Sequence, residues 1–198
     1  MDRAEADEPG ARAPAPGALR VVQQFINSVD IEAGTEELSS PRALSAWLHE
    51  HGLTPRPTRL SAGDVERARE FRELLRAVAM AHNGHPMDAI AVRSFNRQLA
   101  DIGMVARFES PDALRIGGAS GGISGALARI VGIIYAEMQT GRWVRLKVCA
   151  RDVCRWAFYD HSRNRTGTWC SMAVCGARVK ASTYYRRRRS RASALRSS

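Results

Sequence analysis

The sequence has no cysteine in its first 148 residues and no apolar run long enough to span a membrane. A transmembrane helix needs roughly 18 or more consecutive apolar residues, whereas the longest candidate, 130–138, contains Glu137. A secretory signal begins with basic residues and then turns apolar, but residues 1–17 are acidic and rich in Pro and Ala. We therefore expect a cytoplasmic protein with no membrane partner, in a compartment where disulfides are rare.

The charge of the chain is unevenly placed. The length of 198 residues allows one ordinary domain plus a small module, and 44% apolar with 25% charged residues excludes a disordered chain. Residues 1–144 hold 16 basic and 18 acidic residues, a balance of −2, whereas residues 145–198 hold 14 basic and 2 acidic residues, a balance of +12. This asymmetry indicates a near-neutral body that carries a basic, polyanion-seeking end.

Apolar residues recur at helical spacing in much of the body. The expected helices cover residues 18–29, 42–50, 61–82, 86–100 and 123–138. Ser40 and Pro41 give the second helix a cap and a proline at its first position, and Ser61 with Asp64 forms a capping box for the third. The other face of the third helix alternates Glu and Arg, which predicts a solvated surface.

A small hairpin and a glycine-rich stretch separate the last two body helices. Short β-like runs at 104–108 and 113–116 flank Ser110-Pro111-Asp112, which predicts a hairpin. The stretch 117–122 lacks the spacing and the lysine of a phosphate-binding Walker loop, so we favour a flexible connection. The expected fold is mainly α, a helical N-terminal body with a small β-hairpin, plus a small C-terminal four-cysteine zinc-finger module.

All four cysteines lie in the basic end, as two pairs. Cys149 and Cys154 are separated by four residues, as are Cys170 and Cys175, and fifteen residues join the pairs. Two such pairs can surround one ion, and four thiolates form a closed, structural zinc site. Buried or disulfide-linked cysteines are the alternative, which their clustering disfavours. We expect one structural Zn²⁺, and with its four thiolates the basic end keeps a charge of about +10.

Arginines and aromatic residues alternate between the two cysteine pairs. The candidate nucleic-acid contacts here are Arg155, Arg163 and Arg165. Aromatic side chains beside them can stack on bases, but we favour a structural role, a minicore of the zinc module. Its expected members are Trp156, Phe158 and Trp169. Asp160 is expected to orient Arg163 or to cap the following turn.

A further basic segment follows Cys175. Residues 176–185 look helical, and the arginines beyond them extend the helix. The candidate nucleic-acid contacts here are Arg178, Lys180, Arg186, Arg187, Arg188 and Arg189. Each phosphate they neutralise steepens the salt dependence of binding by roughly 0.9 in a log–log plot. The alternative is a solvated, disordered tail that binds any polyanion weakly, since these contacts position a protein without reading bases.

The cysteine region resembles the CGNR zinc finger. The residues that carry the resemblance are Cys149-Ala150, Cys154-Arg155-Trp156, Trp169-Cys170-Ser171-Met172 and Cys175-Gly176-Ala177-Arg178. In bacteria that finger usually ends a protein whose front part is an ABATE domain, described as a stress-induced transcription regulator. The body is similar to that domain in Asn27-Ser28-Val29-Asp30 and in the helices with Trp47-Leu48 and Leu74-Leu75. Two departures are Ala177 in place of the name-giving Asn, and Gly167-Thr168 in place of an arginine pair.

The resemblance, over residues 18–185, implies four regions and a regulatory function. The regions are a disordered leader (1–17), an ABATE-like helical domain (18–144), a CGNR-type zinc finger (145–185) and a basic tail (186–198). We expect a bacterial transcription regulator whose zinc module and tail bind DNA, with RNA as the other nucleic acid, and whose helical domain senses a ligand or partner. Such a protein would be nucleoid-associated. A homodimer is expected if it reads a palindromic operator.

Two other classes of function are a protein-interaction module and an enzyme. In the alternative reading the chain is a protein-interaction module, its zinc is purely structural, and its tail meets acidic protein or RNA. An enzyme is not expected. Gly118-Ala119-Ser120-Gly121-Gly122 fits a nucleophile elbow, but the chain lacks the strand–helix alternation of a hydrolase, and the one histidine after it is His161. The His49–x–His51 pair is expected to lie at the surface without a metal.

Overall fold

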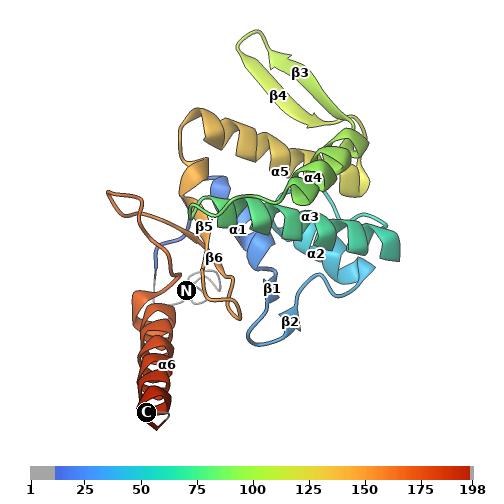
Figure 1. The fold of residues 1–198 in the computed structure, drawn as a ribbon. Coiled ribbons are helices and arrows are strands. Elements are labelled where there is room, and N and C mark those ends of the chain that lie inside the picture. Colours follow the sequence, from blue (N-terminus) through green and yellow to red (C-terminus); the bar gives the residue numbers. More distant parts are fainter. Residues whose placement is uncertain (1–11, 197–198) are drawn as a thin grey trace.

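The computed structural model describes residues 12–196. Their elements are α1 (Leu19–Asn27), β1 (Val29–Asp30), β2 (Thr35–Glu36), α2 (Pro41–Glu50), α3 (Ala62–Ala81), α4 (Ala89–Ile102), β3 (Met104–Ser110), β4 (Ala113–Gly118), α5 (Gly122–Gln139), η1 (Trp143–Arg145), β5 (Leu146–Val148), β6 (Ala157–Tyr159), η2 (Met172–Gly176) and α6 (Ala177–Arg196). The fold is mainly α with a small four-cysteine module, as predicted (Figure 1). No helix among the described residues is long and apolar enough to cross a membrane.

Local capping sets where the body helices begin. The Ser40 hydroxyl accepts a hydrogen bond from the Ala43 N–H at 3.1 Å, and α2 starts at the next residue. Ser61 and Asp64 form both bonds of the predicted capping box ahead of α3. The fourth helix begins later than predicted, at Ala89 instead of Pro86. Its first turn is capped by Asp88, whose carboxylate accepts a hydrogen bond from the Ile90 N–H at 3.1 Å.

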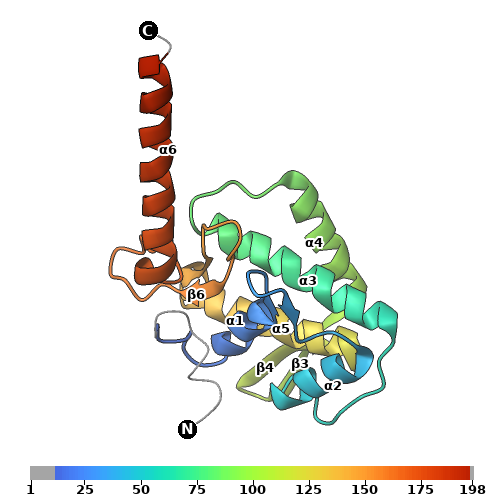
Figure 2. The ribbon, with the colours of Figure 1, turned by 90° about the horizontal axis from the view of Figure 1, so that it is seen from below.

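Helix α5 lies at the centre of the body, as its apolar sequence predicts. It packs beside α1, α3 and α4, and the β3–β4 hairpin stands against it (Figures 1 and 2). Its inward side chains, Ile123, Leu127, Ile130 and Ile134, are buried in one continuous core, and each such side chain stabilises the fold by about 1.5–3 kcal/mol. Gly132 lets the helix approach the hairpin closely, because a Cβ there would lie 2.7 Å from the Ile116 carbonyl oxygen.

The polar face of α3 is not simply solvated, contrary to the prediction. Arg72 and Arg76 are only 4% and 3% exposed. The two terminal nitrogens of Arg72 donate to the Glu36 carboxylate at 2.7 Å, and one also donates to the Ser28 hydroxyl at 3.0 Å. A buried charge needs such partners to offset its desolvation. The Glu–Arg alternation does not reveal which arginines turn inward to meet distant residues.

A short hairpin that the sequence analysis did not predict joins the body to the cysteine region. Strands β5 and β6 pair antiparallel, so alternate side chains point to opposite faces. On one face, the buried side chains of the body core are Leu146, Val148, Ala157 and Tyr159. On the other face, Phe158 belongs to the cluster around the cysteines. The hairpin is therefore buried between two cores.

Polar side chains of the body bind the backbone of β6. The Asn27 side chain accepts from the Ala157 N–H at 2.7 Å and donates to the Ala157 carbonyl at 2.9 Å, as a neighbouring strand would. Arg76 donates to the Arg155 carbonyl and to the Ile26 carbonyl, both at 2.6 Å. The Asn27 bonds satisfy an otherwise unpaired edge of β6, and the Arg76 bonds join the residue that precedes Trp156 to the end of α1, so together they fasten the zinc module to α1 and α3.

The end of α3 binds the backbone of β5 in the same way. The Nδ1 of His82 lies 2.7 Å from the Leu146 carbonyl oxygen, and the Asn83 side chain donates to the Val148 carbonyl. Since a carbonyl only accepts, Nδ1 carries the proton in this bond. Burial lowers the pKa of His82, which favours the neutral ring.

Part of the predicted leader is ordered against the zinc module. The guanidinium of Arg12 lies 4.5 Å from the centre of the Phe158 ring and donates to the Trp169 carbonyl at 3.2 Å. Ala15 is buried, and its N–H donates to the Gln23 side chain at 2.7 Å. The prediction of disorder is therefore wrong for residues 12–17. Their Pro- and Ala-rich composition gives no indication of these contacts. Residues 1–11 lie outside the described residues.

The partly buried His82 predicts a specific pH dependence of stability. Its pKa in the folded chain lies below the unfolded value of 6.5, so below that pH the unfolded state binds a proton that the folded state excludes. The free energy of unfolding should therefore fall as the pH drops below about 6.5. Urea unfolding of zinc-loaded protein at pH 7.5 and 5.5 measures this loss. His82→Asn, which keeps a donor for Leu146, should show a smaller loss.

The exposed His85 supplies the control for this prediction. His85→Asn removes a histidine from the loop before α4 and should leave the pH dependence unchanged. An equal pH-dependent loss in His82→Asn and wild-type protein would show that His82 does not cause it.

Candidate metal centre and its basic surroundings

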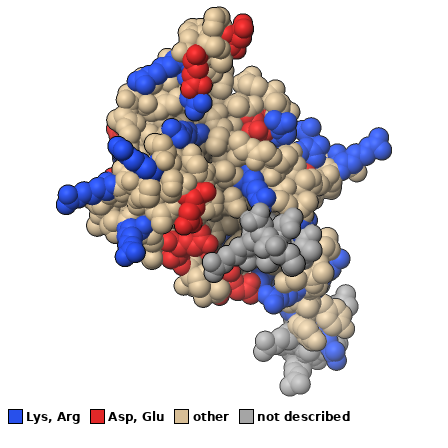
Figure 3. Space-filling model, turned by 180° about the vertical axis from the view of Figure 1, so that it is seen from behind, with Lys and Arg blue, Asp and Glu red and all other residues tan. Residues whose placement is uncertain are grey.

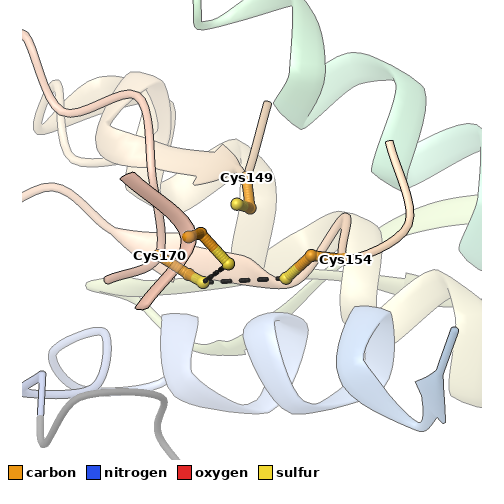
Figure 4. Close-up of side chains that lie close together, drawn as sticks. Cys149, Cys154 and Cys170 are labelled. Carbon is orange, nitrogen blue, oxygen red and sulfur yellow. Dashed lines mark hydrogen bonds between the residues drawn. The ribbon is translucent and has the colours of Figure 1, made fainter. Parts of the chain in front are cut away.

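The four cysteines converge on one point. The ligand atoms of Cys149, Cys154, Cys170 and Cys175 all lie within 4.8 Å of one another. The Cys170 sulfur lies 3.7 Å from that of Cys154 and 3.6 Å from that of Cys175 (Figure 4). A tetrahedral site with Zn–S bonds of about 2.3 Å has sulfur–sulfur edges of about 3.8 Å, whereas a disulfide would bring two sulfurs to about 2.05 Å. The geometry thus fits a tetrahedral zinc ion and excludes disulfides.

These cysteines hold one structural Zn²⁺, as the sequence predicts. Three of them are buried and Cys154 is partly exposed. Four protein thiolates fill a tetrahedral site and leave no open position for a substrate. No other group of three or more potential ligands occurs among the described residues. The ring nitrogens of His49 and His51 instead lie near local backbone carbonyls.

The thiols are electrostatically coupled when no metal neutralises them. Hydrogen bonds from Cys154 and Cys170 lower the pKa of Cys149 to about 2. The same bond with Cys149 raises the pKa of Cys154 to about 12, and the pKa of Cys170 is raised as well. Zinc binding must displace the protons of these thiols, so metal affinity rises with pH.

The predicted minicore surrounds the metal site. Phe158 is fully buried in the cysteine cluster, and Trp156 and Trp169 pack against it. Cys175 lies in η2, a single π-helical turn that begins after Ser171, whose hydroxyl accepts the Val174 N–H at 3.2 Å; Cys170 directly precedes this cap. This small core is what a short zinc module can bury without a larger hydrophobic interior.

The structure explains most of the motif after the last cysteine. A Cβ on Gly176 would crowd the Met172 sulfur and lie 3.2 Å from the Trp169 ring, so a larger residue here would force the exposed Met172 side chain to shift. Ala177, which replaces the family's Asn, is exposed at the start of α6. The missing amide therefore leaves no hole in the interior. Arg178 follows it and faces the body.

Asp160 binds a lysine instead of the predicted Arg163. Lys147 and Asp160 are 3% and 1% exposed, and the Lys147 ammonium donates to the Asp160 carboxylate at 2.9 Å. The ammonium also donates to the carbonyls of Arg165 and Gly167, at 2.5 and 3.2 Å. All three ammonium protons thus have acceptors, which offsets the cost of burying the charge. This ion pair could not be predicted from the sequence, because Lys147 lies on the unpredicted strand β5 and Asp160 directly follows the unpredicted strand β6.

The loop that leads to the second cysteine pair is built around the same carboxylate. Burial raises the pKa of Asp160, but hydrogen bonds from Ser162, Lys147 and Gly167 outweigh it and lower the pKa to about 2. The Ser162 N–H is 3.0 Å from the carboxylate, so Asp160 caps this turn as predicted. A Cβ on Gly167 would lie 2.8 Å from the carboxylate. Glycine at this departure from the family pattern therefore permits the close approach.

Glu32 of the body pairs with two arginines of the zinc module. It lies in the turn between β1 and β2 and accepts from Arg151 at 2.6 and 3.0 Å and from Arg178 at 2.8 Å. The bond from Arg151 is the main cause of the lowered pKa of Glu32. Arg178, a predicted nucleic-acid contact, is therefore already paired with a carboxylate. Sequence spacing could not reveal a pair of residues 146 positions apart.

The other candidate contacts lie on exposed surface. Arg155, Arg163, Arg165 and Lys180 are exposed, as are Arg186 and Arg188 on α6. Arg155 has a weak ion pair with Asp152 at 3.7 Å. The side chains of Arg187 and Arg189 lie outside the described residues. On the face drawn in Figure 3, basic side chains are scattered over the body and also lie along the projecting end.

Helix α6 projects away from the body (Figures 1 and 2). Of its described side chains, only Val179 and Thr183 are partly buried, whereas Tyr184 and Tyr185 are 61% and 63% exposed. Twenty helical residues extend over about 30 Å. The helix therefore presents basic and aromatic side chains to solvent without an apolar face turned toward the body.

Removing the zinc should loosen the zinc module and also its junction with the body, which is the β5–β6 hairpin. The purified chain should contain about one zinc, and a strong chelator should accelerate amide exchange at Ala157, whose N–H binds Asn27. Helix α4 belongs to the body and serves as the internal reference. Cys170→Ser should lose the metal and reproduce the effect, because metal binding and folding are coupled. A folded, metal-free protein with four reactive thiols would contradict the zinc assignment.

Two family models match the chain. The model named zf-CGNR, described as "CGNR zinc finger", matches residues 145–188, and the model named ABATE, described as "Putative stress-induced transcription regulator", matches residues 19–153. No curated protein matches it. The two matched regions overlap over residues 145–153, which contain β5, the strand where the body core meets the cysteine region. Because the second match spans more than half of the sequence, the chain belongs to the ABATE family and carries a C-terminal CGNR zinc finger.

Proposed function

We propose that this ABATE-family protein binds DNA through α6 and the exposed arginines of its zinc module, and that its helical body senses a ligand or partner. The observation that carries the proposal is the projecting basic helix. A helix that is polar on all sides has little to gain from packing on its own domain. The major groove of DNA admits an α-helix, and phosphates on both sides neutralise its arginines.

The chemistry of the site supports positioning contacts more than base reading. Arginine binds phosphate in a bidentate manner, and the exposed Tyr184 and Tyr185 add aromatic surface beside the arginines. RNA or an acidic protein surface would also satisfy such charges, and these are the alternative partners. A cytoplasmic, nucleoid-associated location follows from the DNA-binding proposal.

The proposal includes no catalytic step. Ser120, in the glycine-rich turn before α5, would need a base to act as a nucleophile. His161, the histidine that follows it in sequence, lies in the zinc module, and its Nε2 is 3.1 and 3.2 Å from the carbonyl oxygens of Ala13 and Pro14 in the segment before α1. A four-thiolate zinc likewise offers no position for a substrate.

DNA binding should depend on the α6 arginines beyond their contribution to net charge. Fluorescence anisotropy with duplex DNA over a range of salt concentrations measures this. Arg186→Ala with Arg188→Ala should weaken binding and reduce the log–log salt slope by about 1.8, since each phosphate contact contributes about 0.9. The matched control, Arg93→Ala with Arg97→Ala, removes the same charge from exposed positions of α4. Equal loss in both pairs would contradict a specific role for α6.

Point variants test the DNA-binding proposal better than a chain truncated after residue 144 does. Cutting there would remove Leu146, Val148, Ala157 and Tyr159 from the body core. The truncated chain would then expose that core, and any loss of DNA binding could not be assigned to the missing arginines.

Glu32 should limit DNA binding, because its carboxylate competes with phosphate for Arg151 and Arg178. Glu32→Gln should tighten binding, and if both arginines then reach phosphates the salt slope should steepen by up to about 1.8. Glu50→Gln, at an exposed position of α2, makes the same change in net charge and serves as control. The prediction fails if the two variants bind DNA equally well.

A further inference from the structure

Two adjoining cavities open where the β3–β4 hairpin meets α5 and the loop after α2. They have volumes of about 370 and 590 Å³ and share Glu109, Arg115 and Arg129 as lining residues. Both volumes fall in the range of about 300–1,000 Å³ of small-molecule sites. We propose that they form one site for a small organic acid, with its carboxylate in the smaller cavity and its aliphatic tail in the larger one. This inference rests on the ligand-sensing half of the proposed function.

The smaller cavity has an excess of positive charge. Arg107, Arg115 and Arg129 line it, and Glu109 is its one acidic lining residue. Glu109 is already engaged, because Arg115 donates to it with two nitrogens, one at 3.0 Å. Arg129 has one bond, to the Gly52 carbonyl at 3.2 Å, and Arg107 has no ion pair among the described residues. Two guanidinium charges therefore lack a carboxylate in the cavity wall.

The hairpin places two of these arginines against each other. In the register of β3 and β4, Arg107 lies directly opposite Arg115. Like charges at directly opposite positions destabilise an antiparallel pair. Glu109 supplies Arg115 with a carboxylate, but Arg107 has none among the described residues. A bound carboxylate that accepts from Arg107 and Arg129 would supply the missing partner through charge-assisted hydrogen bonds.

Two glycines in the cavity wall are not required by the fold. Gly117 and Gly121 line the smaller cavity, and neither has a positive φ. A Cβ at either would meet no atom within 4 Å. Gly118, by contrast, needs to be glycine, because a Cβ there would lie 2.9 Å from the Gly125 backbone. Side chains at 117 and 121 would therefore extend into open space at the wall of this cavity.

The larger cavity supplies an apolar wall. Its apolar lining residues include Val21, Leu53, Leu114, Ile116, Ile133 and Ala136. Leu114 is 56% exposed, so the hairpin leaves part of this face without a protein partner. Because guanidinium groups bind either carboxylate or phosphate, the apolar wall decides between ligand classes. It favours an aliphatic acid over an inorganic anion, since burying methylene groups adds affinity.

Calorimetry on the full, zinc-loaded chain tests this site, with octanoate as the probe. Octanol has the tail without the charge, and acetate and inorganic phosphate have charge without the tail. Octanoate should bind at one site, at least tenfold more tightly than each of the three. Binding of octanol as tight as that of octanoate would overturn the arginine half of the site. Equal binding of acetate or phosphate would overturn the apolar half.

Variants then locate the site. Arg107→Ala should weaken octanoate binding at least tenfold, and it should fold normally because Arg107 has no described ion pair to lose. Gly121→Ala should also weaken binding by placing a methyl group in the cavity, whereas Arg93→Ala on α4 should not. Octanoate binding that neither Arg107→Ala nor Gly121→Ala reduces would overturn the proposal. DNA is absent from these measurements, so their failure and the failure of DNA binding are independent results.

Discussion

The burial of one short hairpin on both of its faces governs the rest of the structure. Alternate side chains of β5 and β6 enter the body core and the cysteine cluster, so neither core is complete without the other. Zinc fixes one face by drawing Cys149 and Cys154, on the connection that follows β5, toward the second cysteine pair. Asn27 and Arg76 fix the strand edge from the body side. The zinc finger is therefore structurally continuous with the ABATE domain and is not a separate, appended domain.

This arrangement determines how α6 is presented. The helix follows Cys175 and Gly176 without a linker, and Glu32 holds Arg178 in its first turn. Its direction is thus set by the metal site and by the turn between β1 and β2. A change in the body that shifts Glu32 would alter the presentation of α6, and with it the proposed DNA binding, because Glu32 contacts both parts. Such coupling requires two arrangements of the junction that differ in their affinity for DNA. The ion pairs of Glu32 with Arg151 and Arg178 are the contacts that would differ between the two arrangements.

Local signals in the sequence predicted the features that depend on neighbouring residues. The helix caps at Ser40 and Ser61, the central helix α5, the zinc ligands and the aromatic minicore all follow from short spacings. Features that depend on distant partners were missed, because strands of two or three residues carry no usable period. The Lys147–Asp160 pair and the Glu32 contacts belong to this class. The burial of Arg72 was predictable from the sequence, because Arg72 lies four residues after the buried Ala68 on the apolar stripe of α3.

The positive charge of the C-terminal quarter divides into two roles. Lys147 is buried beside Asp160, and Arg145 donates to the carbonyls of Asp160 and Ser162, so these cations support the loop behind the metal site. Arg151 and Arg178 are paired with Glu32. The basic charge nearest the zinc is thus largely used by the fold itself. The charge available to a polyanion lies farther out, on the loop between the cysteine pairs and along α6, and net charge alone overstates how many cations face a partner.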